Sequence, residues 1–196
     1  MIGMAWEEKM YKGKHKQGEI ELVKQVKVYE NKFCEFFDDD VKFPDGGLGK
    51  FLRLKMKGNY SVAILPITKQ GEMVFIKTFR HSARGWGFEV PKGYGATGEK
   101  PLDCAKRELL EETGLSSKKF TYLGLYHESP STMQCGLHCF VAQDCKKTSS
   151  TKLENTEVIK ESIIVNSIDE LPSADYKDAI TEMMVYKYLS LTQNKK

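Results

Sequence analysis

Glutamates gather in the middle of this chain at a spacing that could serve metal-dependent chemistry. Glu108, Glu111 and Glu112 stand at positions i, i+3 and i+4, and Glu99 precedes them. On a helix with about 100° per residue, the three later carboxylates would share an arc of roughly 100°. Carboxylates this close repel one another, and Mg²⁺ or Mn²⁺ would relieve that repulsion while leaving coordination positions for water and phosphate oxygens. The spacing therefore indicates either a metal site for phosphate chemistry or a solvated acidic face.

One helix must carry these carboxylates, and the sequence predicts its two ends. Pro101 suits a first helical turn, because its missing N–H is not needed there, and Gly114 suits the left-handed residue that closes a helix. We therefore predict a helix over residues 101–113. The arc beside the carboxylates is apolar and can pack on a core, through Leu102, Ala105 and Leu109.

The stretch 93–115 resembles the signature of the Nudix hydrolase family, G-x5-E-x7-R-E-U-x-E-E-x-G-U, in which U is bulky and aliphatic. Every fixed position of that signature is matched, namely Gly93, Glu99, Arg107, Glu108, Leu109, Glu111, Glu112, Gly114 and Leu115. The resemblance implies an α/β fold, the Nudix α/β/α sandwich with a mixed sheet. It also implies a hydrolase that splits diphosphates with Mg²⁺ or Mn²⁺ as cofactor.

The same resemblance implies a set of metal ligands. Glu108 and Glu112 would be the principal ligands, joined by Glu111 and by the backbone carbonyl of Lys92, and Glu89 would support the metal site. Carboxylate and carbonyl oxygens are the donors that Mg²⁺ prefers.

Catalytic roles are likewise implied for Arg107, Glu111 and Glu112. Arg107 is expected to orient the glutamates through charge-assisted bonds, which a lysine would make less well because it lacks the guanidinium fork. A general base is often supplied by the loop before the last strand, where Glu157, or failing it Glu154, is found. If that loop lies too far away, a glutamate of the signature would take the role.

The flanking sequence resembles the ADP-ribose and nucleoside-diphosphate-sugar branch of the family. The run FIKTFRHSARGWGFEVPKGYG is similar to the region before the signature in that branch, and Pro130 lies sixteen positions after Gly114. This resemblance implies that Arg80 and, close to it in the sequence, Arg84 contact a phosphate or terminal sugar, and that Pro130 lies in the substrate site. Trp86 could stack on a base or simply pack against its neighbours.

Two departures from that branch keep other substrates open. Ser131 stands where the branch usually has glycine followed by an acid, and Lys92 replaces a common alanine. A Pro-Lys-Gly triplet occurs in relatives that cleave dinucleoside polyphosphates or diphosphoinositol phosphates. We predict a pyrophosphohydrolase that yields a nucleoside monophosphate and a sugar phosphate. The alternatives are hydrolysis of dinucleoside polyphosphates, capped RNA or diphosphoinositol phosphates, and a non-catalytic nucleotide sensor.

Composition, charge and cysteine spacing indicate in which compartment the protein is expected and which kinds of partner it is expected to bind. The 196 residues are 40% hydrophobic and 29% charged, and the net charge of +3 is spread among interspersed acids, which argues against a nucleic-acid-binding stripe. Five cysteines form no C-x-x-C pair, and Cys135, His138 and Cys139 match no common zinc finger. No apolar run approaches the roughly 20 residues of a membrane span. We expect a cytoplasmic protein that binds a nucleotide-type substrate and, by resemblance, forms a homodimer.

The strand and helix patterns divide the chain into parts. We predict a tail and small antiparallel β unit over residues 1–58, a Nudix domain over 59–192 and a disordered tail over 193–196. Within the domain, residues 62–67 and 73–79 should form a hairpin around a Lys-Gln-Gly turn. Residues 143–157 should be an exposed loop. Further strands are predicted over 120–127, 137–142 and 162–165, and a last helix over 175–191.

Overall fold

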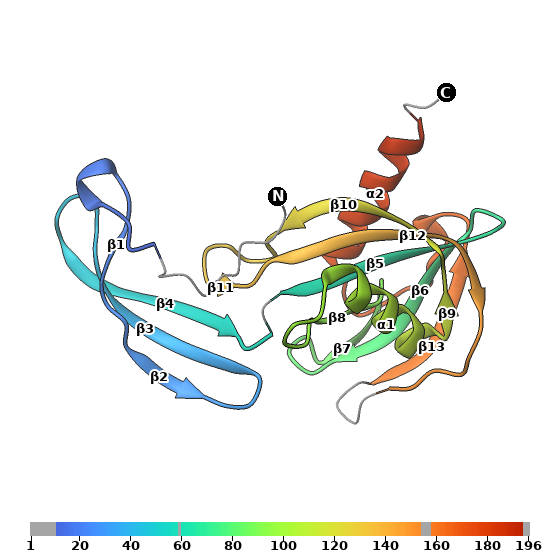
Figure 1. Cartoon of the computed structure of the whole chain (residues 1–196), viewed down its shortest axis with the longest axis horizontal. Helices are drawn as coiled ribbons and strands as arrows, with labels where there is room; N and C mark the ends of the chain where they lie inside the picture. The colour runs from blue at the N-terminus through green and yellow to red at the C-terminus, as the bar shows by residue number, and fades with distance from the viewer. Residues whose placement is uncertain (1–10, 59, 154–157, 194–196) are drawn as a thin grey trace. The chain divides into compact units, whose positions relative to one another are not determined.

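The computed structural model describes residues 11–58, 60–153 and 158–193 (Figure 1). The chain forms two compact units. One comprises residues 1–59 and 127–135, and the other comprises residues 60–126 and 136–196. Glu154 and Glu157, the two candidates for a general base outside the signature, lie outside the described residues.

The first unit is a five-stranded sheet around one long strand. Strand β3 (Cys34–Lys42) pairs antiparallel with β4 (Leu48–Met56) along its whole length. The acids in the middle of β3 also have partners on β4, and Gly46, whose φ is 89°, lies in the turn between the two strands. The remaining strands are β1 (Glu21–Lys24), β2 (Lys27–Glu30) and β11 (Met133–Gln134).

The second unit contains an eight-stranded mixed sheet whose path runs β10-β12-β5-β6-β13. Strand β5 (Ser61–Thr68) lies at its centre, parallel to β12 (Leu137–Lys147), while β10 (Lys119–Tyr126) is antiparallel to β12. The other strands are β6 (Met73–Arg80), β7 (Gly85–Glu89), β8 (Lys92–Tyr94), β9 (Leu115–Ser116) and β13 (Ile159–Val165).

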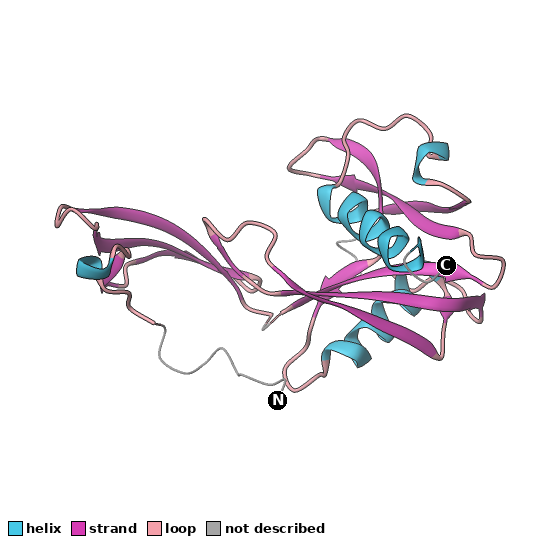
Figure 2. Cartoon of the chain, turned by 90° about the horizontal axis from the view of Figure 1, so that it is seen from above, coloured by secondary structure: helices cyan, strands magenta, loops and turns pink. Residues whose placement is uncertain are grey.

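Alternation along the central strand explains why the sheet is covered on both faces. Val62 and Ile64 belong to a core with the helix α1 (Pro101–Thr113), whereas Ala63 and Leu65 belong to a core with α2 (Ala179–Gln193). Successive side chains on a strand point to opposite faces, so one strand serves both cores. Figure 2 shows the two helices on opposite sides of this sheet. The predicted α/β/α arrangement is confirmed.

The predicted hairpin exists, but its strands separate after the turn. Ile67 pairs with Met73 next to a turn closed by the bond from Thr68 N–H to the Glu72 carbonyl oxygen (2.8 Å). Beyond it, β5 pairs with β8 and β12, while β6 pairs with β7 and β13. The chain therefore passes from β7, the partner of β6, to β8, the partner of β5, and β8 leads into the signature.

The two predicted boundaries that differ most from the structure are the end of β12 and the start of α2. Strand β12 continues to Lys147, because β9 pairs with its last residues, so residues 143–147 are not loop. The last helix begins at Ala179 rather than at residue 175, because the Asp178 side chain accepts a hydrogen bond from the Thr181 N–H (2.9 Å) and so caps the helix.

Candidate active site

Helix α1 has the predicted bounds, and its end depends on Gly114. Gly114 has φ of 68° and donates its N–H to the Leu110 carbonyl oxygen at 2.8 Å. A Cβ at this position would lie 2.3 Å from the Ser149 carbonyl oxygen, so no larger residue fits. The helix is therefore stopped sharply by a residue that local geometry requires.

Two of the signature carboxylates are buried. Glu108 is 5% exposed and Glu112 is 4% exposed, whereas Glu111, on the outer side, is only partly buried. Ala105 and Leu109 are fully buried beside them against β5 and β12. Because an ionised carboxylate is costly to bury without partners, each of these two glutamates must be compensated by polar groups or a cation.

Arg107 is the main cationic partner of the signature carboxylates. Its Nη1 lies 2.7 Å from Glu108 Oε1 and 3.0 Å from Glu111 Oε2, and its Nε and Nη2 each lie 3.0 Å from an oxygen of Glu99. Nη2 also donates to the Tyr94 carbonyl oxygen at 3.1 Å. A planar guanidinium can make all these bonds at once, whereas a lysine ammonium could not.

The loop before α1 is held by Glu99 and Tyr60. Glu99 accepts the two bonds from Arg107 and one from the Ala96 N–H at 3.0 Å. The Tyr60 hydroxyl donates to the Glu99 carbonyl oxygen at 2.6 Å, and the Gly95 N–H donates to the Tyr60 carbonyl oxygen at 3.0 Å. Both ends of the loop are thus fixed to the start of β5.

Strand β8 contacts the two buried carboxylates through its backbone. The Lys92 N–H donates to Glu112 Oε2 at 3.0 Å. At Gly93 an added Cβ would lie 2.0 Å from the carboxyl group of Glu108, so the glycine allows the Glu108 carboxylate to lie directly against the strand. The backbone of residues 92 and 93 and the side chains of Glu108 and Glu112 are therefore brought together.

Glu89 lies in a cluster of charged and phenolic groups. Arg80 binds it with two bonds (3.0 and 2.6 Å), Lys92 Nζ lies at 2.8 Å, and the Tyr176 hydroxyl donates at 2.5 Å. Burial alone would raise the pKa of Glu89, but the bonds from Arg80 and the charge of Lys92 outweigh it and lower the pKa to about 2. Glu89 is thus an anion held by two cations.

The predicted substrate-binding residues lie at the end of β6, in the turn after it, in β7 and in the first unit. Arg84 is exposed, with φ of 52° and its Nη1 2.9 Å from His81 Nδ1, in the turn between β6 and β7. Trp86 is partly buried and packs edge-on against Phe79, with ring centroids 5.5 Å apart. Pro130 belongs to the first unit. Arg80, the fourth of these residues, binds Glu89 through two hydrogen bonds.

Comparison with known proteins decides the family. The family model for the NUDIX domain matches residues 58–182, which is more than half of the chain. The chain belongs to the NUDIX family.

Individual relatives of this NUDIX protein align with most of its length. The chain is 28% identical over 178 residues to the ADP-ribose pyrophosphatase of Bacillus subtilis (strain 168). These aligned residues cover 89% of this chain and 95% of that protein. It is 28% identical over 153 residues to the methanol dehydrogenase activator of Bacillus methanolicus, covering 78% and 80% of the two chains.

A solved crystal structure of an ADP compounds hydrolase superposes with a TM-score of 0.75, at 20% identity, over 90% of this chain and 95% of that chain. This likeness shows that the two proteins share a fold. The family and fold that the signature predicts are thus confirmed.

Sequence reasoning missed several residues that support this NUDIX site. Tyr176 and Asp178 lie just before α2 yet contact Glu89 and Lys92. Asp175 accepts the Trp86 N–H at 2.8 Å and so holds the start of β7. Aspartate is a preferred residue just before a helix, and this preference could have placed Asp178 at a helix cap but not beside Lys92.

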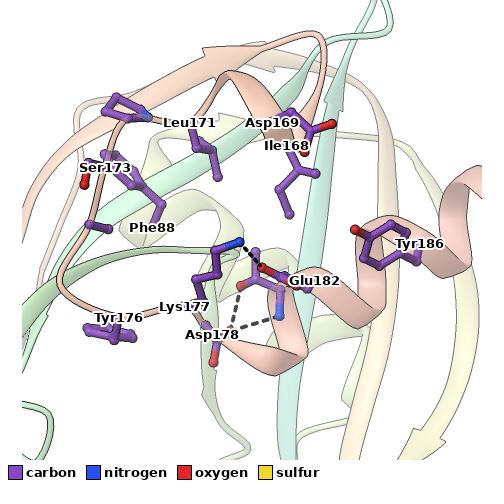
Figure 3. A pocket seen from close by; sticks show the side chains of 13 residues that line it. Phe88, Ile168, Asp169, Leu171, Ser173, Tyr176, Lys177, Asp178, Glu182 and Tyr186 are labelled. Atoms are coloured by element: carbon purple, nitrogen blue, oxygen red, sulfur yellow. Dashed lines mark hydrogen bonds and ion pairs between the residues drawn. The ribbon is translucent and has the colours of Figure 1, made fainter.

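A pocket of about 320 Å³ opens beside the first turn of α2 in the NUDIX unit. Its lining mixes apolar and charged side chains, among them Phe88, Leu171, Lys177, Asp178 and Glu182. Figure 3 shows the contact of Lys177 with Glu182 (3.4 Å) and the bonds of Asp178 to the helix start. None of the α1 glutamates lines this pocket.

The stability of the NUDIX unit should fall in acid partly through Glu99. The hydrogen bonds from Arg107 lower the pKa of Glu99 to about 2, from 4.5. A carboxyl with a lowered pKa stabilises the fold fully above about pH 4.5, and this stabilisation is lost as the pH falls towards 2. The difference in unfolding free energy between the wild type and Glu99→Gln should therefore shrink between about pH 5 and pH 3. Chemical denaturation in metal-free buffer measures it, and a constant difference would contradict the assignment.

Among the described residues, no helix of this NUDIX protein combines the length and the apolar character that crossing a bilayer requires.

Proposed function

We propose that this protein is a divalent-metal-dependent pyrophosphohydrolase that cleaves the diphosphate of ADP-ribose or a related nucleoside-diphosphate sugar. The products would be a nucleoside monophosphate and a sugar phosphate. One observation carries the proposal: Glu108 and Glu112 are buried on one helix against β8, in a chain that aligns over 89% of its length with an ADP-ribose pyrophosphatase.

The donor set fits a hard divalent cation. Glu108, Glu111 and Glu112 offer only oxygen atoms, and Gly93 leaves space for Glu108 against the strand. Among the described residues no three acidic, histidine or cysteine side chains form a ready cluster, and Arg107 binds one oxygen of Glu108 and one of Glu111. A cation would therefore share or displace these Arg107 contacts. When bound, such an ion neutralises phosphate oxygens and lowers the pKa of water.

The remaining chemistry belongs to residues of this chain. Arg107 would orient Glu108 and Glu111 for the ion, and the Lys92 N–H would orient Glu112. The general base would be Glu157 or, failing it, Glu154. If neither reaches the site, a signature glutamate such as Glu111 would act as the base. Arg80, Arg84, Trp86 and Pro130 stay as proposed substrate contacts, with Arg80 acting also as a partner of Glu89.

A substrate screen tests the proposal. Purified protein with Mg²⁺ or Mn²⁺ is incubated with ADP-ribose, other nucleoside-diphosphate sugars, dinucleoside polyphosphates, capped RNA and diphosphoinositol phosphates, and products are separated chromatographically. We expect AMP and ribose phosphate from ADP-ribose, and no product when a chelator is added. Turnover of one of the other classes alone would overturn the substrate assignment.

A non-catalytic nucleotide sensor is the second candidate function. The engagement of Glu108 and Glu111 by Arg107 favours it, because carboxylates held by a guanidinium need no metal. The same screen separates the two: tight nucleotide binding, measured by calorimetry, with no product over hours would support the sensor. The odd number of cysteines without C-x-x-C pairs supports a reducing compartment such as the cytoplasm for either function.

A homodimer through the first unit completes the proposal. Apolar side chains are exposed on one face of its sheet, with Leu48 78% and Leu52 53% exposed on β4 and Tyr29 58% exposed on β2. Residues two apart on a strand share a face, so Leu48 and Leu52, which are four residues apart, lie on the same face of β4. Exposed apolar clusters of this kind mark interaction surfaces.

Leu52→Glu should convert the dimer to a monomer. The substitution places a charge in the apolar face, and a buried unpaired carboxylate opposes association. Size-exclusion chromatography with light scattering measures the mass of the wild type, of Leu52→Glu and of Lys16→Glu, an exposed control in the same unit. A Leu52→Glu variant that keeps the dimer mass would show that this face is not the interface.

A further inference from the structure

The side chain of Lys92 joins two carboxylates that lie far apart in the sequence. Its Nζ lies 2.8 Å from Glu89 Oε2 and 2.9 Å from Asp178 Oδ2, and the side chain is only 15% exposed. The backbone N–H of the same residue donates to Glu112 Oε2. Lys92 therefore connects the helix α2, through its side chain, with the helix α1, through its backbone.

Asp178 is itself fixed by the first turn of α2. Its Oδ2 accepts the Thr181 N–H at 2.9 Å and the Thr181 hydroxyl at 2.6 Å, besides the Lys92 ammonium. The same Thr181 oxygen accepts the Val90 N–H at 2.9 Å. One carboxylate and one hydroxyl thus hold both ends of the short segment that leads into β8.

The segment between these contacts has little freedom to move. Val90 is fully buried, Pro91 has a fixed φ, and the Pro91 carbonyl oxygen accepts the Ile64 N–H at 2.9 Å. The position of the Lys92 N–H is consequently set by α2 and β5 together. A change at Asp178 can therefore reach the Glu112 carboxylate through Lys92, or through Thr181 and Val90 if the Thr181 bonds are also lost.

We infer that Lys92 and Asp178 are a positioning pair that holds Glu112 in place for the metal ion. The inference rests on the proposed function. It assigns to the lysine side chain a role separate from the backbone carbonyl that the family signature implies. Partners that orient a metal ligand typically change metal affinity or activity by about 10- to 100-fold when they are removed.

Asp178→Asn tests the pair most cleanly. Asparagine keeps an oxygen that can accept both Thr181 bonds and cap α2, but it loses the negative charge that holds Lys92. We expect Mn²⁺ affinity, measured by titration calorimetry without substrate, to fall about 10-fold or more, with kcat falling and the KM for the nucleotide changing less. The thermal midpoint reports whether the variant is folded.

A double-mutant cycle shows whether the two residues act together. Lys92→Met should weaken Mn²⁺ binding to a similar extent. The Mn²⁺ affinity of the double variant should then lie within about twofold of the affinity of Lys92→Met alone, because the two residues act as one unit. Should Lys92→Met prove unfolded, Lys92→Gln takes its place because it keeps a polar head. Asp169→Asn is the matched control, because Asp169 lines the same pocket as Asp178 and its carboxylate accepts the Ser167 hydroxyl at 3.4 Å.

The outcomes are distinct. Folded Asp178→Asn protein with wild-type Mn²⁺ affinity would overturn the positioning pair, as would additive effects in the double variant. A wild-type protein that hydrolyses none of the substrates would instead overturn the proposed hydrolase, while the Mn²⁺ titration would still decide whether Lys92 and Asp178 hold Glu112.

Discussion

Glu112→Gln should lower kcat for diphosphate cleavage by roughly 100-fold or more at saturating Mg²⁺. Glutamine has the size of glutamate and an oxygen that can still accept the Lys92 N–H, so the backbone contact at 3.0 Å can be kept. What disappears is the negative charge that binds the cation. Losing a single group that stabilises developing charge typically costs about 10²- to 10³-fold in kcat.

The loss should not come from unfolding. Glu112 is 4% exposed and stands one residue from Glu111 and four from Glu108, so neutralising it reduces carboxylate repulsion in the metal-free protein. We therefore expect the metal-free thermal midpoint of Glu112→Gln to equal or exceed that of the wild type, while the increase of the midpoint on adding Mn²⁺ is lost. Such a pattern separates a metal defect from a folding defect.

Glu161→Gln is the control for that experiment. Glu161 is exposed on β13 and lies 3.7 Å from Lys77, so the same chemical change there removes only a weak surface ion pair. Its turnover should be that of the wild type. If Glu112→Gln also turned over at the wild-type rate at saturating Mg²⁺, the proposed mechanism would be wrong.

Local rules account for the parts of the fold that were predicted correctly. Helix α1 begins at Pro101 and ends before Gly114 because both residues act on the backbone next to them. Strand β5 was predictable because its run of apolar residues is short and bounded by a turn. Each of these features needs information from only a few neighbouring residues.

Long-range contacts account for what was not predicted. Residues 127–135 join the first unit because β11 pairs with β4, and nothing in either sequence indicates that register. Strand β12 extends to Lys147 only because β9 is available to pair with it. The start of α2 moved to Ala179 because one of several nearby acids, Asp178, is the one that caps it.

The candidate site shows the same division. The signature identified Arg107 and its glutamates, because their spacing on one helix determines that they are neighbours. It could not indicate that Lys92 meets Asp178, which lies 86 residues further along the chain. A single sequence holds no signal for such a pair unless the whole sheet can be assembled first.

Gly93→Ala should be nearly as damaging as the loss of a carboxylate, although it removes no functional group. An added Cβ would lie 2.0 Å from both the carboxyl carbon and Oε1 of Glu108, far inside van der Waals contact. Glu108 is 5% exposed and bound to Arg107, so a shift of its carboxylate away from β8 would disturb that bond. Either its carboxylate or β8 must shift, and overpacking of this kind typically costs about 1–3 kcal/mol of stability.

We expect Gly93→Ala to lower kcat/KM by roughly 100-fold or more, since misplacing a catalytic group by about 1 Å can cost that much. The Mn²⁺ affinity should fall with it. Gly47→Ala is the matched control, because its Cβ would approach only the flexible Asp45 carboxylate, at 3.1 Å. Activity of Gly93→Ala within about twofold of the wild type would mean that Glu108 functions away from the strand. In that case Glu108 would be buried against β8 only in the metal-free protein, and its carboxylate would have to move before the metal could bind.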